Sequence, residues 1–322
     1  MKKVSRHIVF IAIIFFLITS TFLDKNAEAA QEKDASRPWW GEVESGLIYD
    51  NNILQVNSNK ESDVIWESSL LLSYQPKEIE WYALAVFDRY LDNSELNYAY
   101  YEIGGERVLA QDLYGGFSLN VSPTSQLDKQ DPVRDPFPIS LGSYGTSFFI
   151  ERDTARYGAF GLNIAYTRLD YNTPFNAKDS NLFDLGPTWF YRFNTAWSFY
   201  GQYTHTLAKA RRGLIPVGAS QFFDDISYRA NALSLLVTHM MSKKTRLRFR
   251  YKIRTMRFEP DARDTFHLGR KDKTHALYAE VKQSLLKNVL LRGRLERFMR
   301  RSNQSFVEFS ENRLMLSATY QF

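Results

Sequence analysis

Apolar and polar residues alternate with a period of two along most of this chain. The segment 245–258, "TRLRFRYKIRTMRF", shows the pattern most clearly. Side chains on a β-strand point alternately to its two faces, whereas a helix would spread them around its circumference. The segment is therefore predicted to be a strand with one basic face and one apolar face. The cations are Arg246, Arg248, Arg250, Lys252 and Arg254, and between them lie Leu247, Phe249, Tyr251 and Ile253.

Alternating segments of this kind recur from residue 41 to residue 322 and predict an all-β fold. The count is about fourteen strands, and twelve or sixteen are the alternatives if a strand is missed or split, because such barrels have even counts. In 79–92 both faces carry aromatic residues, and in 225–241 the parity slips midway, which predicts a β-bulge there. The predicted strands are 41–55, 63–76, 79–92, 95–109, 111–122, 144–153, 157–171, 181–194, 196–209, 225–241, 244–258, 273–286, 289–301 and 311–322.

The connections between these segments are alternately short and long. A transmembrane antiparallel up-and-down β-barrel has this layout, with short periplasmic turns and longer outer loops, whereas a soluble sandwich has no reason to sort its loops. The sequence therefore predicts a barrel in the cell outer membrane with both termini periplasmic. The short connections lie near 76–77, 110–111, 153–156, 194–195, 242–243 and 286–288, and the long ones include 122–143, 172–180, 211–225 and 259–273.

The first residues have the pattern of a secretory signal peptide. Three cations precede an almost continuous apolar run from Ile8 to Leu23, and a small-x-small cleavage site follows it. An uncleaved membrane anchor is the alternative. The predicted organisation is a signal peptide over 1–29, a short periplasmic linker over 30–40 and the barrel over 41–322.

Net charge argues against a nucleic-acid partner. The whole chain carries a formal charge of +5, and excluding the predicted signal peptide leaves about +3. This net positive charge is too small for a nucleic-acid binder, and an exported protein is not expected to meet nucleic acid. The chain also contains no cysteine. A closed barrel needs no disulfides, since it pairs every strand edge by hydrogen bonds.

The chain ends on the alternating segment "NRLMLSATYQF". Its last residue, Phe322, is aromatic. This end resembles the closing strand of bacterial outer-membrane barrels, where a terminal aromatic residue is part of the signal for the insertion machinery. The barrel-insertion machinery is therefore an expected partner.

The basic face of 245–258 is predicted to line a wet lumen, because cations at the bilayer midplane would cost about 2–4 kcal/mol each. The segment 289–301 repeats the pattern, and 273–286 between them contributes Glu280 and Lys282 to the same wall. One interpretation is a pore lining that favours anions. The other is a plug-like network in which these cations pair with luminal carboxylates. The predicted pore-lining residues are Arg246, Arg248, Arg250, Lys252, Arg254, Arg292 and Arg294. The carboxylates available for pairing are Glu67, Glu102, Glu106, Asp184, Glu280 and Glu296.

Cations in the predicted outer loops offer contacts to lipopolysaccharide phosphates, and a solvated charged loop is the alternative. Outer-membrane lipid and lipopolysaccharide are therefore expected partners. The cations are Arg211, Arg212, Arg263, Arg270, Lys271 and Lys273.

The sequence predicts no enzyme, no cofactor and no metal. Glu259, Asp261, Asp264 and His267 lie close together in sequence, but no recognisable ligand loop contains them. His205 in "YTHT" has no serine where a lipase strand would need one. The acidic pairs and the Asp–His pair of an omptin-type protease cannot be assigned either.

Two stretches, "GLIYDNNIL" and "RRSNQSFVEFSENRLMLSATYQF", resemble the barrel domain of the surface lipoprotein assembly modifier family and related outer-membrane barrels. The similar features are an aromatic-Asp-x-Asn step, a Ser-Asn step in the last outer loop, and a final strand of the form Asn-Arg, six further residues and then Tyr-x-Phe. That family carries a helical-repeat domain before its barrel, which this sequence does not have. The resemblance implies the barrel fold and no particular functional residue.

Three classes of function fit these observations. The first is a porin-like pore for small solutes with a basic, anion-favouring lumen. The second is an export or assembly factor that moves a partner protein to the cell surface. The third is a structural surface protein with a blocked lumen.

Overall fold

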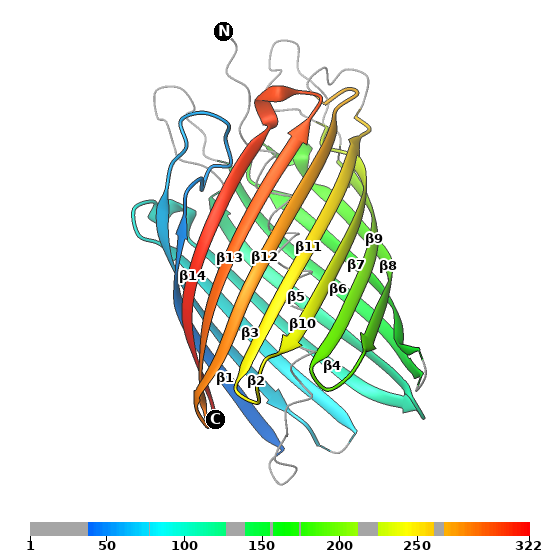
Figure 1. Cartoon of the computed structure of the whole chain (residues 1–322). Helices are drawn as coiled ribbons and strands as arrows, with labels where there is room; N and C mark the ends of the chain where they lie inside the picture. The colour runs from blue at the N-terminus through cyan, green and yellow to red at the C-terminus, as the bar shows by residue number, and fades with distance from the viewer. Residues whose placement is uncertain are drawn as a thin grey trace.

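The computed structural model describes residues 38–76, 78–126, 139–154, 157–173, 175–211, 225–260 and 267–322. Fourteen strands form one closed antiparallel barrel, as the sequence predicted (Figure 1). No helix in these ranges is long and apolar enough to cross a membrane. The predicted signal peptide and most of the predicted linker lie outside the described residues.

The strands match the predicted segments to within a few residues at most ends. The largest difference is in the first strand, which starts at Trp39 and ends at Asp50, whereas the sequence analysis extended it to residue 55. The strands are β1 (Trp39–Asp50), β2 (Asp63–Tyr74), β3 (Ile79–Tyr90), β4 (Tyr98–Ala110), β5 (Leu113–Gln126), β6 (Ser140–Thr154), β7 (Gly158–Tyr171), β8 (Ser180–Arg192), β9 (Trp197–Ala210), β10 (Tyr228–Met240), β11 (Thr245–Phe258), β12 (Lys271–Leu286), β13 (Val289–Ser302) and β14 (Phe309–Gln321).

Each strand pairs with its neighbours in sequence, and β14 returns to pair with β1. The predicted bulge in 225–241 was wrong, because β10 keeps a continuous register with both β9 and β11. The parity seemed to slip because Leu236 is an apolar residue that faces inward, where it is buried. Register shifts occur instead at 108–110 in β4, 122–125 in β5 and 284–286 in β12.

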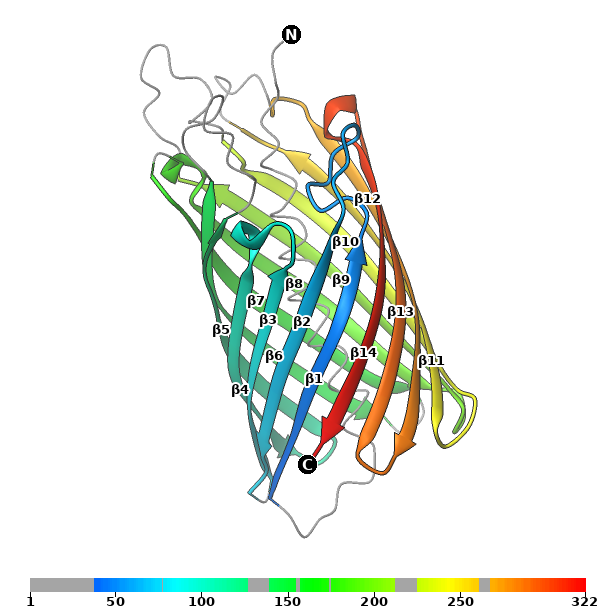
Figure 2. The same ribbon diagram turned by 90° about the vertical axis from the view of Figure 1, so that its left-hand side faces the viewer.

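The two ends of the barrel differ in the length of their connections (Figures 1 and 2). Short turns join the strands at the end where the chain terminates, and the longer loops lie at the opposite end. Three of the long loops contain single 3-10 turns, η2 (Ser94–Leu96), η3 (Asn176–Lys178) and η4 (Ser305–Val307). The alternation predicted from the sequence is therefore present, and we refer to the short-turn end and the long-loop end below.

The outer surface of the barrel is an apolar belt. Tryptophans lie near the short-turn ends of several strands, for example Trp39, Trp81 and Trp197, which are 60%, 46% and 42% exposed. Apolar belts flanked by aromatic residues are typical of transmembrane barrels, whose outward face contacts acyl chains. The belt includes Leu47, Leu70, Ile103, Leu119, Phe148, Ile164, Leu185, Leu233, Phe249, Leu277, Leu295 and Leu316.

The buried apolar residues lie inside the barrel, towards the long-loop end. One cluster combines inward residues of β6 to β11 with Ile139, Phe175 and Ile226 from the long loops. A second combines inward residues of β1, β2, β3 and β14 with loop residues that include Ile53 and Leu54. Residues 53–54, predicted as strand, thus belong to a loop that turns into the barrel. These clusters narrow the interior at the long-loop end.

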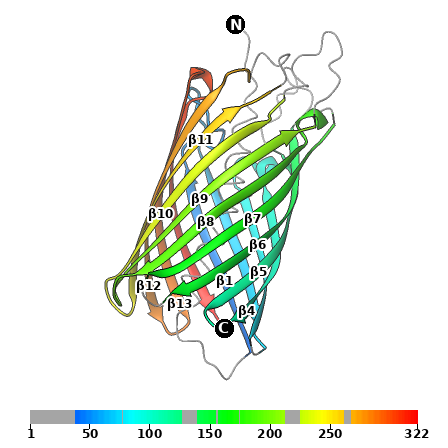
Figure 3. The same cartoon turned by 90° about the vertical axis from the view of Figure 1, so that its right-hand side faces the viewer.

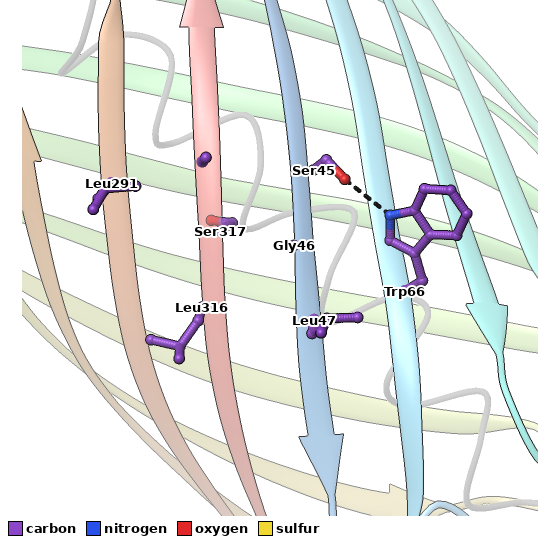
Figure 4. Close-up of a pocket in the computed structure, with 8 residues that line it drawn as sticks. Ser45, Gly46, Leu47, Trp66, Leu291, Leu316 and Ser317 are labelled. Carbon is purple, nitrogen blue, oxygen red and sulfur yellow. Dashed lines mark hydrogen bonds between the residues drawn. The ribbon is translucent and has the colours of Figure 1, made fainter. Parts of the chain in front are cut away.

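The seam between β1 and β14 carries a shallow groove on its outer face (Figure 4). Small residues form its floor, and Trp66 on β2 borders it with its indole Nε1 donating to Ser45 Oγ at 2.9 Å. On the inner face of the same seam, a side chain at Gly46 would collide with Ser317. The seam strands therefore approach closely only because these positions are small.

The orientation of β11 can be tested by adding charge to its outward face. Phe249→Arg should lower the free energy of unfolding in lipid vesicles by at least about 2–4 kcal/mol, because it places a cation near the middle of the apolar belt. Thr255→Arg on the same face lies closer to the long-loop end and should cost about 0–1 kcal/mol. The measurement is denaturant unfolding of the vesicle-inserted barrel. Equal losses for the two variants would contradict the assigned belt.

Candidate pore lining

All seven predicted pore-lining cations face the interior of the barrel. On β11 the inward side chains alternate with outward apolar ones, and Arg248, Arg250 and Arg254 are buried while Phe249 is 53% exposed. On β13, Arg292 and Arg294 face inward and Leu291 and Leu295 face outward. We call β11, β12 and β13 the basic sector, which faces the viewer in Figure 1.

Carboxylates pair with several of these cations. Arg248 lies opposite Glu280 in the β11–β12 register, and their side chains form an ion pair at 3.4 Å. Arg292 contacts Glu280 at 3.7 Å and Glu44 of β1 at 2.9 Å. Arg294 pairs with Glu296 at 2.7 Å. Of the carboxylates predicted as partners, Glu280 and Glu296 therefore contact these arginines, and Glu44 was missed.

Aromatic rings hold other arginines of the wall. The guanidinium of Arg250 lies 5.7 Å from the ring centre of Tyr278. Arg254 lies 5.4 Å from the ring of Tyr228 and also donates to its hydroxyl at 3.2 Å. An arginine over an aromatic face gains a cation–π interaction while keeping its hydrogen-bonding edge available. These contacts fix the direction of the side chains along the wall.

One register row near the short-turn end of the basic sector contains only cations. There Arg246 lies opposite Lys282, and Lys282 lies opposite Arg292 on the other side. This row of three neighbouring strands therefore presents only cations, whereas the next row alternates Arg248, Glu280 and Arg294.

Sequence reasoning missed Arg313, which joins the ends of the sheet. Its Nε lies 2.9 Å from Asp50 of β1 and 2.5 Å from Glu311 of β14, and both carboxylates are fully buried. Its guanidinium also lies 5.5 Å from the ring centre of Phe298 on β13. Gln55 of the first long loop donates to Glu311 at 2.7 Å. The parity of the last strand, which puts 311 and 313 on the face opposite Leu314 and Leu316, would have revealed this inward arginine.

A second missed feature is an acidic sector on β1 to β4. Carboxylates face inward on these strands, and in the described residues of the four strands no lysine or arginine does, since Arg89 and Arg107 are exposed on the outer face. Only β14 separates the acidic sector from the basic sector, so the interior is divided by charge. The inward carboxylates are Glu42, Glu44, Asp50, Asp63, Glu67, Glu80, Asp88, Glu102 and Glu106.

The other predicted luminal carboxylates lie on β2, β4 and β8, outside the basic sector. Glu102 accepts hydrogen bonds from Tyr82 and Tyr100, and Asp184 on β8 accepts one from the Thr206 hydroxyl at 2.5 Å. Glu67 lies directly opposite Asp88 across the β2–β3 pair. These groups extend the polar lining away from the seam.

The wall formed by β5 to β9, which faces the viewer in Figure 3, has a largely uncharged, polar inner lining. A pocket of about 90 Å³ lies along it. A water molecule occupies about 30 Å³ in the liquid, so the pocket has room for a few waters or a small solute. Its polar lining includes Ser118, Asn120, Thr167, Thr188, Tyr200, Gln202 and Thr204.

The structure places some of the residues that were considered for metal binding and catalysis. In the part of the chain that the structure describes, no group of three or more His, Cys, Asp or Glu could hold a metal ion. His267 is buried and stacks on Phe258 with ring centres 5.1 Å apart, while Asp261 and Asp264 lie outside the described residues. His205 faces outward and bonds Asn231 at 2.9 Å.

The fold is that of bacterial outer-membrane β-barrels. No family model and no curated protein matches the chain. A solved structure described as a bacterial polysaccharide outer membrane secretin is similar with a TM-score of 0.55 at 9% identity, over 88% of this chain and 98% of that chain. A Pseudomonas aeruginosa FadL homologue is similar with a TM-score of 0.52 at 8% identity, over 88% and 90% of the two chains.

The CymD monoaromatic hydrocarbon channel is similar with a TM-score of 0.50 at 10% identity, over 89% of each chain. At such identities the likeness concerns the fold alone. These structures agree with an outer-membrane barrel and do not single out the surface lipoprotein assembly modifier family.

Removing the cation that bridges the seam should be strongly destabilising. Arg313→Met leaves Asp50 and Glu311 buried without their guanidinium, and breaking a buried pair in this way costs about 3–5 kcal/mol. Arg301→Met is the matched control, because Arg301 is 75% exposed and pairs with Glu308 at 3.6 Å. An exposed pair of this kind contributes about 0–1 kcal/mol. Unfolding of both variants in the same vesicles measures the difference, and similar losses would show that Arg313 does not tie the seam.

Proposed function

We propose that this protein is a porin-like pore of the outer membrane, with the long-loop end outside the cell and the short-turn end in the periplasm. The observation that carries the proposal is the two-faced construction of β11, which has apolar side chains towards lipid and a row of cations towards the interior. A wall of that composition is stable only around a wet or ion-paired interior. The polar lining of β5 to β9 adds a second hydrophilic surface.

We further propose that the basic sector makes the pore favour anions. Arg246, Lys282 and Arg292 form the all-cation row near the periplasmic end under this orientation. Clustered charge beside a low-dielectric wall raises the local concentration of counter-ions. The acidic sector acts in the opposite direction, so the preference depends on the balance between the two sectors.

A specific observation favours a second candidate, the structural barrel with a blocked lumen. Ion pairs such as Arg248–Glu280 and Arg294–Glu296 neutralise part of the wall, and apolar clusters narrow the long-loop end. A role in export is the third hypothesis and follows from the resemblance to the modifier family. An exported partner encoded beside this protein would support it.

Current recordings in planar bilayers separate the pore from the blocked barrel. Steady ohmic steps are expected for the pore, and a silent bilayer would favour the blocked barrel or the export role. The reversal potential across a salt gradient should show anion preference. That preference should weaken as salt approaches 1 M, where the Debye length falls to about 3 Å.

Charge-neutralising variants of the two sectors should move selectivity in opposite directions. Arg246→Gln with Lys282→Gln should reduce the anion preference and leaves the Arg248–Glu280 pair in place. Glu42→Gln with Glu44→Gln in the acidic sector should increase it, because Glu44 is a partner of Arg292. A parent that prefers cations, or a reversal potential that neither variant moves, would contradict the proposed role of the basic sector.

A further inference from the structure

The outer surface carries a compact group of cations near the long-loop ends of β10 to β13. All of them are exposed and lie on the lipid-facing side of their strands. They are distinct from the pore lining, whose cations face inward on the same strands. We call the group the outer basic patch, and its members are Arg229, Arg257, Lys271, Lys273 and Arg301.

The strand register sets these cations directly against one another. Arg229 lies opposite Arg257, and Arg257 lies opposite Lys271, so one row crosses three strands with only positive charge. In the next row Lys273 lies opposite Arg301. Like charges at directly opposed positions destabilise a sheet. This repulsion lowers the stability of the isolated protein, and an anionic ligand bound between the cations would remove it.

Among the described residues, carboxylates pair with the cations at the two edges of the patch. Arg229 pairs with Glu259 at 2.9 Å, and Arg301 pairs with Glu308 at 3.6 Å. In the described part of the chain no ion pair links Arg257, Lys271 or Lys273 to a carboxylate. The centre of the patch therefore keeps its positive charge towards the surroundings.

The backbone that presents the patch is held by side-chain hydrogen bonds. Asn303, after β13, accepts a hydrogen bond from the backbone N–H of Lys271 at 2.8 Å. The same side chain donates to the carbonyl of Gly269 at 3.0 Å. These bonds fasten the start of β12 to the end of β13, so the cations of the two strands are presented together.

The position of the patch identifies the ligand class. On the same outward faces, Phe249, Leu277 and Leu295 lie further from the long loops and belong to the apolar belt. A cation just beyond the belt lies at the level of lipid headgroups. Surface-exposed cations at this level meet anionic headgroups, and phosphate accepts charge-assisted hydrogen bonds from both arginine and lysine.

We propose that the outer basic patch binds the phosphates of a phosphorylated glycolipid in the outer leaflet, as found in lipopolysaccharide. The ligand bridges the opposed cations and removes their repulsion. The proposal shares the orientation of the barrel with the proposed pore but does not depend on conduction. Of the loop cations considered from the sequence, Lys271 and Lys273 belong to the patch. Arg270 does not, because it is buried against Asp272 and Phe258.

The test compares two quadruple variants, each of which loses four positive charges. The patch variant carries Arg257→Gln, Lys271→Gln, Lys273→Gln and Arg301→Gln. The matched control carries Arg152→Gln, Lys243→Gln, Lys244→Gln and Lys287→Gln, which are exposed cations near the short-turn end. Heat-modifiable gel migration first establishes that both variants form the barrel.

Binding is then measured on the detergent-solubilised full-length barrel with three probes. These are lipid A with both phosphates, dephosphorylated lipid A, and inorganic phosphate. For the parent and the control variant we expect tight binding of bisphosphorylated lipid A that weakens as the salt concentration rises. For the patch variant we expect at least about tenfold weaker binding, since each exposed cation contributes attraction to an anionic surface.

Three results would overturn the proposal. The first is equal affinity of the parent for dephosphorylated lipid A, which would mean that the phosphates are not recognised. The second is an unchanged affinity of the patch variant, which would move any lipid site elsewhere. The third is equally tight binding of inorganic phosphate, which would indicate a soluble anion in place of a glycolipid. A parent barrel that binds lipid A but conducts no current would contradict the proposed pore function and leave the glycolipid proposal unaffected.

Discussion

Closure of the sheet between β1 and β14 is the constraint on which the rest of this structure depends. In a bilayer an unpaired backbone group costs several kcal/mol, so a membrane sheet must leave no open edge. Gly41 and Phe322 exchange backbone hydrogen bonds at 3.0 Å where the first and last strands of the sheet meet. Inside the barrel, Arg313 contacts Asp50 at 2.9 Å and Arg292 contacts Glu44 at the same distance, so opposite charges from the two ends of the chain fasten the seam.

The division of the interior by charge follows from the same closure. Carboxylates concentrate on the first four strands and cations on β11 to β13, far apart in sequence, and only a closed sheet brings the two groups to within one strand of each other. The resulting ion pairs offset part of the desolvation of each charge, which isolated buried cations could not tolerate. The basic sector combines such ion pairs with one register row, Arg246, Lys282 and Arg292, in which the opposed residues of the three strands are all cations.

The outer face follows a different rule, because lipid is its solvent. Most outward side chains in the middle of the strands are apolar, and most outward charges lie near the strand ends, where the cost of exposing a cation falls towards zero. The outer basic patch satisfies this rule and adds a feature that it does not require, the direct opposition of like charges in two successive rows. The same strands thus carry two separate basic surfaces, one facing inward and one facing the leaflet.

The sequence by itself determined the strands to within a few residues, their number to within two, and the inward direction of the cations on β11 and β13, because a period of two and the alternation of loop lengths are local properties. It did not determine which carboxylates meet which cations. Glu44 and Asp50 lie more than two hundred residues from Arg292 and Arg313, and only the closing register brings them together. Nor could it place 51–55, whose apolar residues continue the strand pattern but turn into the interior as a loop. The direct opposition of Arg229, Arg257 and Lys271 was likewise invisible before the register was known, since a shift of one residue in any strand would have moved a charge to the other face.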